Sequence, residues 1–135
     1  MFSNIVVGTD GSDTAALAVS LAADLAKQHG AVLHLISAYK LSTAVADPGV
    51  TGELLRGASD MLLTEVAQTL SGTILKTRSV PGNPADVLVA MAEEVGADLI
   101  VVGSKGMRGA RRVIGSVPNT IAHHAPCHVL IAKTA

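Results

Sequence analysis

Residues 4–12, which have the sequence NIVVGTDGS, give the clearest indication of the fold of this protein. The run begins with β-branched residues and ends in turn-forming ones, which is the pattern of a short buried strand. Beyond it, Leu17, Leu21 and Leu25 recur at the spacing of one helix face. The segment therefore predicts a strand that leads into an amphipathic helix, with Ser12 or the residue after it as the cap.

The same unit of a strand followed by a helix recurs along the chain. Short apolar or alternating runs, each bounded by turn residues, predict four more strands at 31–38, 73–80, 98–103 and 127–132. Helices are predicted from residue 53 to about 66, after the capping pair Asn83 and Pro84, and at 116–124. Residues 40–52 lack such a pattern, and we expect a mobile loop there. The alternation predicts an α/β fold with a doubly wound, Rossmann-like sheet of five parallel strands and helices on both faces.

The composition limits the number of domains and the kind of ligand. With 135 residues, 49% of them hydrophobic, the chain can bury one core, so residues 1–135 are expected to form a single domain. Trp is absent, and Phe and Tyr occur once each, which indicates aliphatic layers like those of a parallel sheet covered by helices. The net charge of -1 excludes a generally basic surface for nucleic acid, so any preference for anionic ligands must be local.

The sequence also predicts a cytoplasmic protein that does not enter a membrane. Cys127 is the single cysteine, so no intramolecular disulfide can form. The first residues lack the basic segment and long apolar run of a secretion signal. No apolar run approaches the roughly 20 residues that a membrane-spanning helix needs.

Two of the predicted strands end in small and polar residues suited to ligand binding. One of these ends is residues 8–12, and the other is residues 103–106. In doubly wound sheets, ligands bind beyond the carboxyl ends of the strands, where helices leave to opposite faces. We therefore expect both segments to lie on the same rim and to form one site.

The segment after the fourth strand combines glycines with cations. Gly103, Gly106 and Gly109 recur at intervals of three, so the backbone can approach a ligand closely. Four of the ten basic residues lie here, namely Lys105, Arg108, Arg111 and Arg112. No Asp or Glu follows Asp98. Because the next helix begins near Ser116 and its amino end favours negative charge, the segment predicts a phosphate site.

These features also have simpler structural interpretations. The glycine-rich segment fits an ordinary loop with solvated cations, and Asp10 fits a residue favoured at the start of a helix. The segment is neither a Walker phosphate loop, since no Gly-Lys-Ser or Gly-Lys-Thr ends it, nor the dinucleotide-binding turn. We favour a phosphate site because glycines, cations and a helix start occur together.

Taken together, residues 9–12 (TDGS) and the glycine-rich run from Gly103 to Val117 resemble the universal stress protein family, and the resemblance covers essentially the whole chain. It implies a sheet with strand order 3-2-1-4-5 and a homodimer formed through the last strand, Cys127 to Ala132. In one branch of the family it also implies ATP bound across the two loops, with Asp10 as a possible partner for Mg²⁺. Such a protein would act as a regulatory or sensor module in the stress response.

The resemblance also implies which residues surround an adenine nucleotide. Thr9 and Asp10 would contact the adenosine part, and the backbone of Ala38 would face the adenine. The glycines, with Ser116 and Val117, would surround the ribose and phosphates. The full set of expected nucleotide-binding residues is Gly8, Thr9, Asp10, Ala38, Val102, Gly103, Lys105, Gly106, Met107, Arg108, Gly115, Ser116 and Val117.

The sequence departs from the ATP-binding pattern of the family at two positions, both among the residues that would surround the phosphates. Eight residues separate Gly106 from Gly115, where nine are usual, and Pro118 stands where a hydroxyl residue often follows. A shorter loop and a lost donor favour AMP or cyclic AMP as the alternative to a triphosphate.

Other functional classes remain as alternatives. One is slow ATP hydrolysis or phosphoryl transfer, in which loop cations neutralise phosphate charge and Asp10 holds Mg²⁺, although no water-activating residue stands out. Another is a nucleotide-free module that dimerises through the last strand. Nucleic acid binding is disfavoured, because no aromatic residue accompanies the basic cluster at 108–112.

The histidines and the cysteine near the end of the chain raise the question of a metal or Cys-His site. The residues concerned are His123, His124, Cys127 and His128. Pro126 interrupts the helix that would align them, so no regular spacing positions a pair of ligands. We expect the two adjacent histidines to stabilise a helix end and the cysteine to be a small buried residue.

Overall fold

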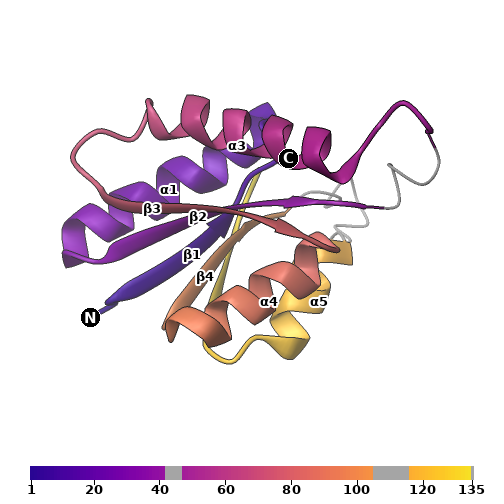
Figure 1. Cartoon of the computed structure of the whole chain (residues 1–135). Helices are drawn as coiled ribbons and strands as arrows, with labels where there is room; N and C mark the ends of the chain where they lie inside the picture. Colours follow the sequence, from indigo (N-terminus) through magenta and orange to yellow (C-terminus); the bar gives the residue numbers. More distant parts are fainter. Residues whose placement is uncertain (42–46, 105–115, 135) are drawn as a thin grey trace.

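The computed structural model describes residues 1–41, 47–104 and 116–134. Its five parallel strands form one sheet in the order β3-β2-β1-β4-β5, which confirms the predicted order (Figure 1). The strands are β1 (Asn4–Gly8), β2 (Val32–Tyr39), β3 (Ile74–Pro81), β4 (Leu99–Gly103) and β5 (His128–Ala132). The helices are α1 (Asp13–His29), α3 (Gly52–Ala67), α4 (Pro84–Val95) and α5 (Ser116–His124).

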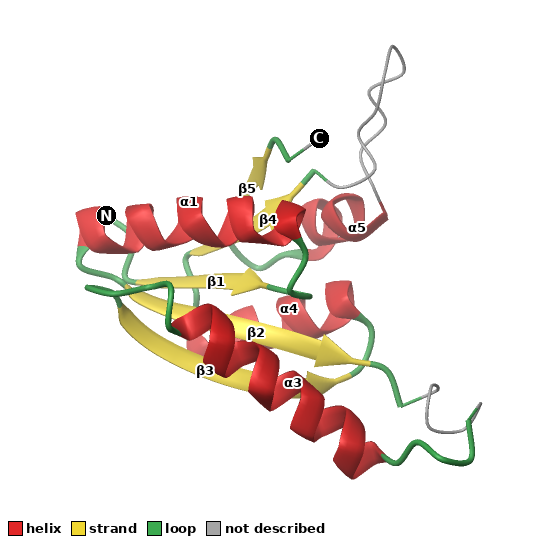
Figure 2. Ribbon diagram, turned by 90° about the horizontal axis from the view of Figure 1, so that it is seen from above, coloured by secondary structure: helices red, strands yellow, loops and turns green. Residues whose placement is uncertain are grey.

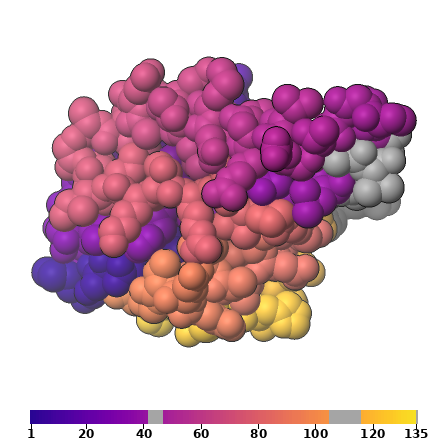
Figure 3. All heavy atoms as spheres, in the orientation of Figure 1, coloured from indigo at the N-terminus to yellow at the C-terminus, as the bar shows by residue number. Residues whose placement is uncertain are grey.

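The helices cover the sheet in two layers. α1 and α3 lie on one face, and α4 and α5 lie on the other (Figures 1 and 2). Figure 3 shows the side on which α3, β3 and α4 meet, where their atoms form one continuous surface. None of the helices in the described ranges is long and apolar enough to cross a membrane.

The helix ends follow the capping signals of the sequence. The Ser12 hydroxyl accepts a hydrogen bond from the Ala15 amide at 3.2 Å, and Gly30 ends α1 in the left-handed conformation at φ 65°. Asn83 caps α4 in the same way, through a 3.1 Å bond from the Ala85 amide. The predicted caps of α1 and α4 are therefore confirmed.

Some predicted element boundaries were wrong by one residue. The second, third, fourth and fifth strands each begin one residue later than predicted. For the second strand the reason is visible, because the Ala31 amide bonds the Ala26 carbonyl at 2.9 Å and closes the end of α1. α3 begins at Gly52, one residue early, because Thr51 caps it with a 3.1 Å bond from the Leu54 amide. Of the loop predicted at 40–52, residues 42–46 lie outside the described ranges.

Two aliphatic clusters fill the space between the sheet and its two helical layers. Successive residues of β1 point to opposite faces, so Ile5 and Val7 enter the cluster beneath α1, while Val6 enters the cluster beneath α4. All three side chains are fully buried. The first cluster also contains Ala22, Leu33 and Leu35, and the second contains Ile36, Leu88, Met91, Ile100 and Ile121. This confirms the expected core of aliphatic layers.

At the amino ends of the strands, polar side chains form hydrogen bonds with the backbone and with one another. Asp98 accepts hydrogen bonds from the amides of Ser3 and Asn4, at 2.8 and 3.1 Å. The side chain of Asn4 lies 3.0 Å from Nε2 of the buried His34. Burial, and secondarily the charge of Lys76, lowers the pKa of His34. These groups are hydrogen-bonded to parts of the fold itself. The opposite rim of the sheet, at the carboxyl ends of the strands, contains a cavity.

Candidate functional site

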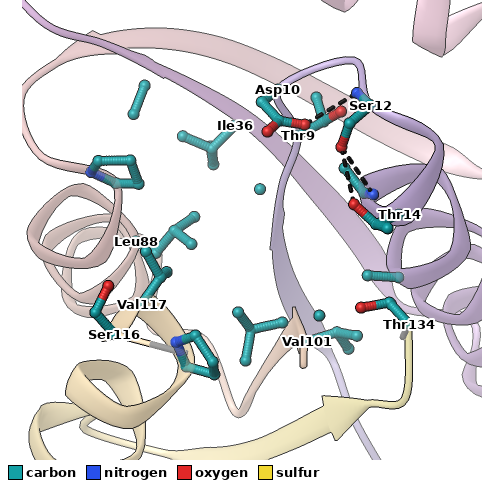
Figure 4. A pocket seen from close by; sticks show the side chains of 18 residues that line it. Thr9, Asp10, Ser12, Thr14, Ile36, Leu88, Val101, Ser116, Val117 and Thr134 are labelled. Atoms are coloured by element: carbon teal, nitrogen blue, oxygen red, sulfur yellow. Dashed lines mark hydrogen bonds between the residues drawn. The ribbon is translucent and has the colours of Figure 1, made fainter. Parts of the chain in front are cut away.

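A cavity of about 510 Å³ lies beyond the carboxyl ends of β1 and β4 (Figure 4). These strands are neighbours in the sheet, yet β1 leads into α1 on one face and the next helix after β4, α5, lies on the other. This is the switch point at which doubly wound sheets bind ligands. The cavity volume lies within the range of roughly 300–1,000 Å³ that is usual for small-molecule sites.

The cavity brings together the two strand ends that the sequence singled out. Eight of the expected nucleotide-binding residues line it, namely Gly8, Thr9, Asp10, Ala38, Val102, Gly103, Ser116 and Val117. The other five expected residues lie outside the described ranges, namely Lys105, Gly106, Met107, Arg108 and Gly115. The same holds for Gly109, Arg111 and Arg112.

The loop after β1 is ordered by its own side chains. The Thr9 amide donates to the Ile36 carbonyl at 2.9 Å and so continues the pairing of β1 with β2. The Thr9 hydroxyl accepts from the Gly11 amide at 3.1 Å, and the Asp10 carboxylate accepts from the Ser12 amide at 2.9 Å. Helix capping falls to Ser12 and not to Asp10. Asp10, which is exposed, thus reaches the cavity rim from a turn of defined shape.

Gly11 is required by that turn. Its φ of 79° lies in the left-handed region, and a Cβ built there would lie only 2.5 Å from Cδ1 of Leu62 in α3. A side chain at this position would strain the turn and would force the Leu62 side chain to move. Gly11 therefore allows the loop to pass closely between the cavity and α3.

The amino end of α5 opens onto the cavity. Ser116 and Val117 line it, and the fully buried Pro118 lies behind them in the first turn. The first amides of a helix have no partner within the helix and attract negative charge. Proline has no amide hydrogen, so this helix offers one donor fewer than usual at its start.

The cavity has an apolar wall that was not predicted from the sequence. Leu88 comes from α4, Ile36 from β2 and Val101 from β4, and Pro84 completes this wall. In Figure 4, Leu88 and Val117 lie on the opposite side of the cavity from Thr14 and Thr134. The sequence predicted that a helix begins near Pro84 and so includes Leu88. Only the tertiary structure shows that the first turns of this helix lie next to β1.

Two further hydroxyl groups of the cavity, those of Thr14 and Thr134, were not predicted from the sequence. Ser12, from the predicted segment 8–12, also lines the cavity, and its hydroxyl lies 3.1 Å from that of Thr14. Asp10 is the one ionisable side chain among the described lining residues. The described part of the cavity thus pairs an apolar wall with hydroxyls and a carboxylate, an arrangement suited to a ligand with a flat apolar part and a polar part.

The histidine and cysteine group near the end of the chain has a different environment. His123 and His124 lie in the last turn of α5, and Cys127 is partly buried just before β5. Burial, then the charge of Asp98, raises the pKa of the Cys127 thiol, which keeps it protonated and poorly nucleophilic. Within the described ranges, no three His, Cys, Asp or Glu side chains are placed to hold a metal ion.

Comparison with known proteins identifies sequence relatives over nearly the whole chain. The family model described as the universal stress protein family matches residues 1–133. A putative universal stress protein of Staphylococcus haemolyticus is 35% identical over 142 residues, covering 98% of this chain and 86% of that protein. A universal stress protein of Methanocaldococcus jannaschii is 33% identical over 141 residues, covering 98% and 83%.

Solved structures share the same architecture. A universal stress protein crystallised in complex with cyclic AMP is 33% identical, with a TM-score of 0.81 and 99% of both chains covered. The UspA protein of Lactobacillus plantarum is 29% identical, with a TM-score of 0.79 and 96% of this chain and 97% of that chain covered. The similarity therefore extends through every strand and helix described above.

Proposed function

Because this chain belongs to the universal stress protein family, we propose that it binds an adenine nucleotide in the cavity beyond β1 and β4. Occupancy of the cavity would make the protein a regulatory module that responds to adenylate levels during stress. We place this role in the cytoplasm, where these nucleotides are made and used. The proposal concerns binding, and catalysis is no part of it.

The observation that carries the proposal is the convergence of two polar strand ends on one cavity with an apolar wall. Asp10 and Thr9 lie at the end of β1, in reach of ribose hydroxyls. Leu88 and Ile36 offer apolar surface to the flat face of a purine. The amino ends of α1 and α5, whose first residues line opposite sides of the cavity, both attract the negative charge of a phosphate.

Within this class we place cyclic AMP and AMP ahead of ATP, although the sequence resemblance alone put ATP first. Pro118 removes an amide donor from the first turn of α5, so fewer donors are available for several phosphates. A relative at 33% identity was crystallised with cyclic AMP. If ATP does bind, we expect Mg²⁺ to accompany it, held by the phosphates with the help of Asp10.

Nucleotide binding should raise the thermal stability of the purified protein. At one hundred times the dissociation constant, the ligand adds about 2.7 kcal/mol to the free energy of unfolding, which corresponds to roughly 10 °C in Tm for a domain of this size. The measurement is a thermal-shift series with cyclic AMP, AMP, ADP and ATP, the last with and without Mg²⁺. Cyclic GMP serves as the control for recognition of the base.

The same series can reject the proposal. If none of the four adenine nucleotides shifts Tm at millimolar concentration, the cavity has another ligand. If cyclic GMP shifts Tm as much as cyclic AMP, the apolar wall does not recognise adenine. Phosphate release from ATP in the same samples tests the enzymatic alternative separately.

We also propose that two copies of the chain pair through β5. This strand lies at the edge of the sheet next to β4, and its residues are largely half-buried. Neighbouring α1, which contacts β5, exposes Leu17 and Leu21 on one side. An unprotected edge strand with apolar surroundings favours pairing with another strand.

Replacing Val129 with proline should dissociate this dimer. The Ala132 carbonyl bonds the Ser104 amide at 2.8 Å, so the backbone of residue 132 faces β4. Because backbone groups alternate along a strand, the Val129 amide faces outward, and proline removes it without breaking a bond to β4. We expect the dissociation constant to rise at least about tenfold, measured by sedimentation velocity.

Val129→Ala is the matched control, because it shortens the side chain and keeps the amide. It should stay dimeric, and circular dichroism should show both variants folded. A proline variant that sediments as the wild-type dimer would exclude the β5 edge as the interface. A wild-type protein that is monomeric at all concentrations would exclude the dimer itself.

A further inference from the structure

The chain that follows β5 is bonded to the wall of the cavity. The Ser104 amide donates to the Ala132 carbonyl at 2.8 Å, and the Ser104 hydroxyl accepts from the Thr134 amide at 2.9 Å. Ser104 is 1% exposed, so this second bond is buried. The first bond continues the pairing of β4 with β5 past the end of β4, and the second ties the backbone of Thr134 to the side chain of Ser104. They place the side chain of Thr134 beside Gly103, at the cavity.

Among residues 1–41, 47–104 and 116–134, the Thr134 hydroxyl is a buried polar group without a partner. The residue is only 8% exposed, and Oγ1 makes no hydrogen bond within the described structure. Leaving a buried hydroxyl unpaired costs free energy that a partner would recover. Thr134 lines the cavity, and Figure 4 shows its oxygen directed toward the cavity interior. A ligand is therefore the natural source of the missing partner.

The surroundings of Thr134 favour a phosphate oxygen as that partner. Thr14, in the first turn of α1, lies on the same side of the cavity (Figure 4). The amino end of α1 carries partial positive charge, which attracts anions. Gly103 lies against Thr134, since a Cβ at Gly103 would lie 3.2 Å from Oγ1 of Thr134. The apolar wall with Leu88 lies across the cavity and suits the base.

We propose that the Thr134 hydroxyl donates a hydrogen bond to a phosphate oxygen of the bound nucleotide, so that Thr134 forms part of the binding site. This inference rests on the proposed nucleotide-binding function. It adds a specificity residue from a segment that lies outside both loops of the family resemblance. It also gives a role to a buried hydroxyl that has no partner in the described part of the chain.

The test compares Thr134→Val with the wild-type protein by isothermal titration calorimetry, using cyclic AMP, AMP and adenosine. A hydrogen bond to a charged group is lost, so the dissociation constants for cyclic AMP and AMP should rise about tenfold or more. The affinity for adenosine should not change, because adenosine has no phosphate. Thr134→Ser, which keeps a hydroxyl, should restore most of the affinity for cyclic AMP.

The stability of the ligand-free variant separates a binding role from a structural one. Valine has nearly the same shape as threonine and removes an unpaired group, so the Tm of free Thr134→Val should stay the same or rise. Thr73→Val is the matched control, because Thr73 has the other buried, unpaired side-chain hydroxyl of the described structure and does not line the cavity. That variant should bind cyclic AMP like the wild type.

The possible outcomes distinguish this inference from the proposed function. If the wild-type protein binds none of the three ligands, the proposed function fails and the inference fails with it. If the wild type binds and Thr134→Val binds equally well, only the inference is overturned. A loss of adenosine affinity equal to the loss for cyclic AMP would also overturn it, because the hydroxyl would then contact the ribose.

Discussion

Replacing Gly103 with valine is expected to lower the affinity for cyclic AMP by about a hundredfold or more. A Cβ at this position would lie 3.2 Å from both Cγ2 and Oγ1 of Thr134, and the two methyl groups of valine would extend farther. Because Gly103 is the last residue of β4 and lines the cavity, the added atoms must push Thr134 aside or occupy ligand space. Both results weaken binding.

The Gly103→Val variant should nevertheless fold. Its position lies at the end of a strand, where a β-branched residue is compatible with the backbone, and its φ is outside the left-handed region. Gly57→Val is the matched control, because a Cβ at Gly57 in α3 meets nothing within 4 Å. The measurements are titration calorimetry with cyclic AMP and circular dichroism of both variants. Wild-type affinity in a folded Gly103→Val protein would show that nucleotide binds elsewhere.

Replacing Ile100 with alanine is expected to lower the free energy of unfolding by about 3 kcal/mol. Ile100 is fully buried in β4, between β1 and β5, and it belongs to the aliphatic cluster with Met91 and Ile121. Deleting its side chain removes apolar contacts and leaves a cavity that the surrounding strands cannot close. Since domains of this size are stable by roughly 5–15 kcal/mol, the loss is a large fraction of the total.

Ile74→Ala is the control for this stability prediction. Ile74 is 59% exposed in the edge strand β3, so the same substitution there should cost less than about 0.5 kcal/mol. Urea unfolding followed by circular dichroism gives both values. With a slope of about 2 kcal/mol per molar urea, the midpoint of Ile100→Ala should fall by about 1.5 M. Equal midpoints for the two variants would contradict the assignment of Ile100 to the core.

Much of the fold was predictable because its signals are local. The β-branched run at 4–8 and the leucines that follow it define a strand and a helix by their spacing alone. Ser12 and Asn83 mark helix starts because their side chains bond amides only two or three residues away. The errors of one residue occurred at the ends of elements, as when the bond from the Ala31 amide to the Ala26 carbonyl completed the end of α1.

The candidate site was predictable only in part. Asp10 and Gly103 stood out because each occurs in a run of turn-forming residues directly after a strand. Leu88 did not stand out, because a leucine on the buried side of a helix looks the same whether it faces a core or a cavity. Thr134 carried no sequence signal at all, since one threonine after a strand fits any surface position.

The sequence by itself determined the order of strands and helices along the chain, the caps of α1 and α4, and the two loops that carry the family resemblance. Periodicity and capping are encoded within a few residues of one another, so they can be read along the chain. The tertiary structure alone decided which side chains face one another across the cavity. Leu88 and Thr134 meet the ends of β1 and β4 only because crossover packing and the pairing of β4 with β5 bring them there.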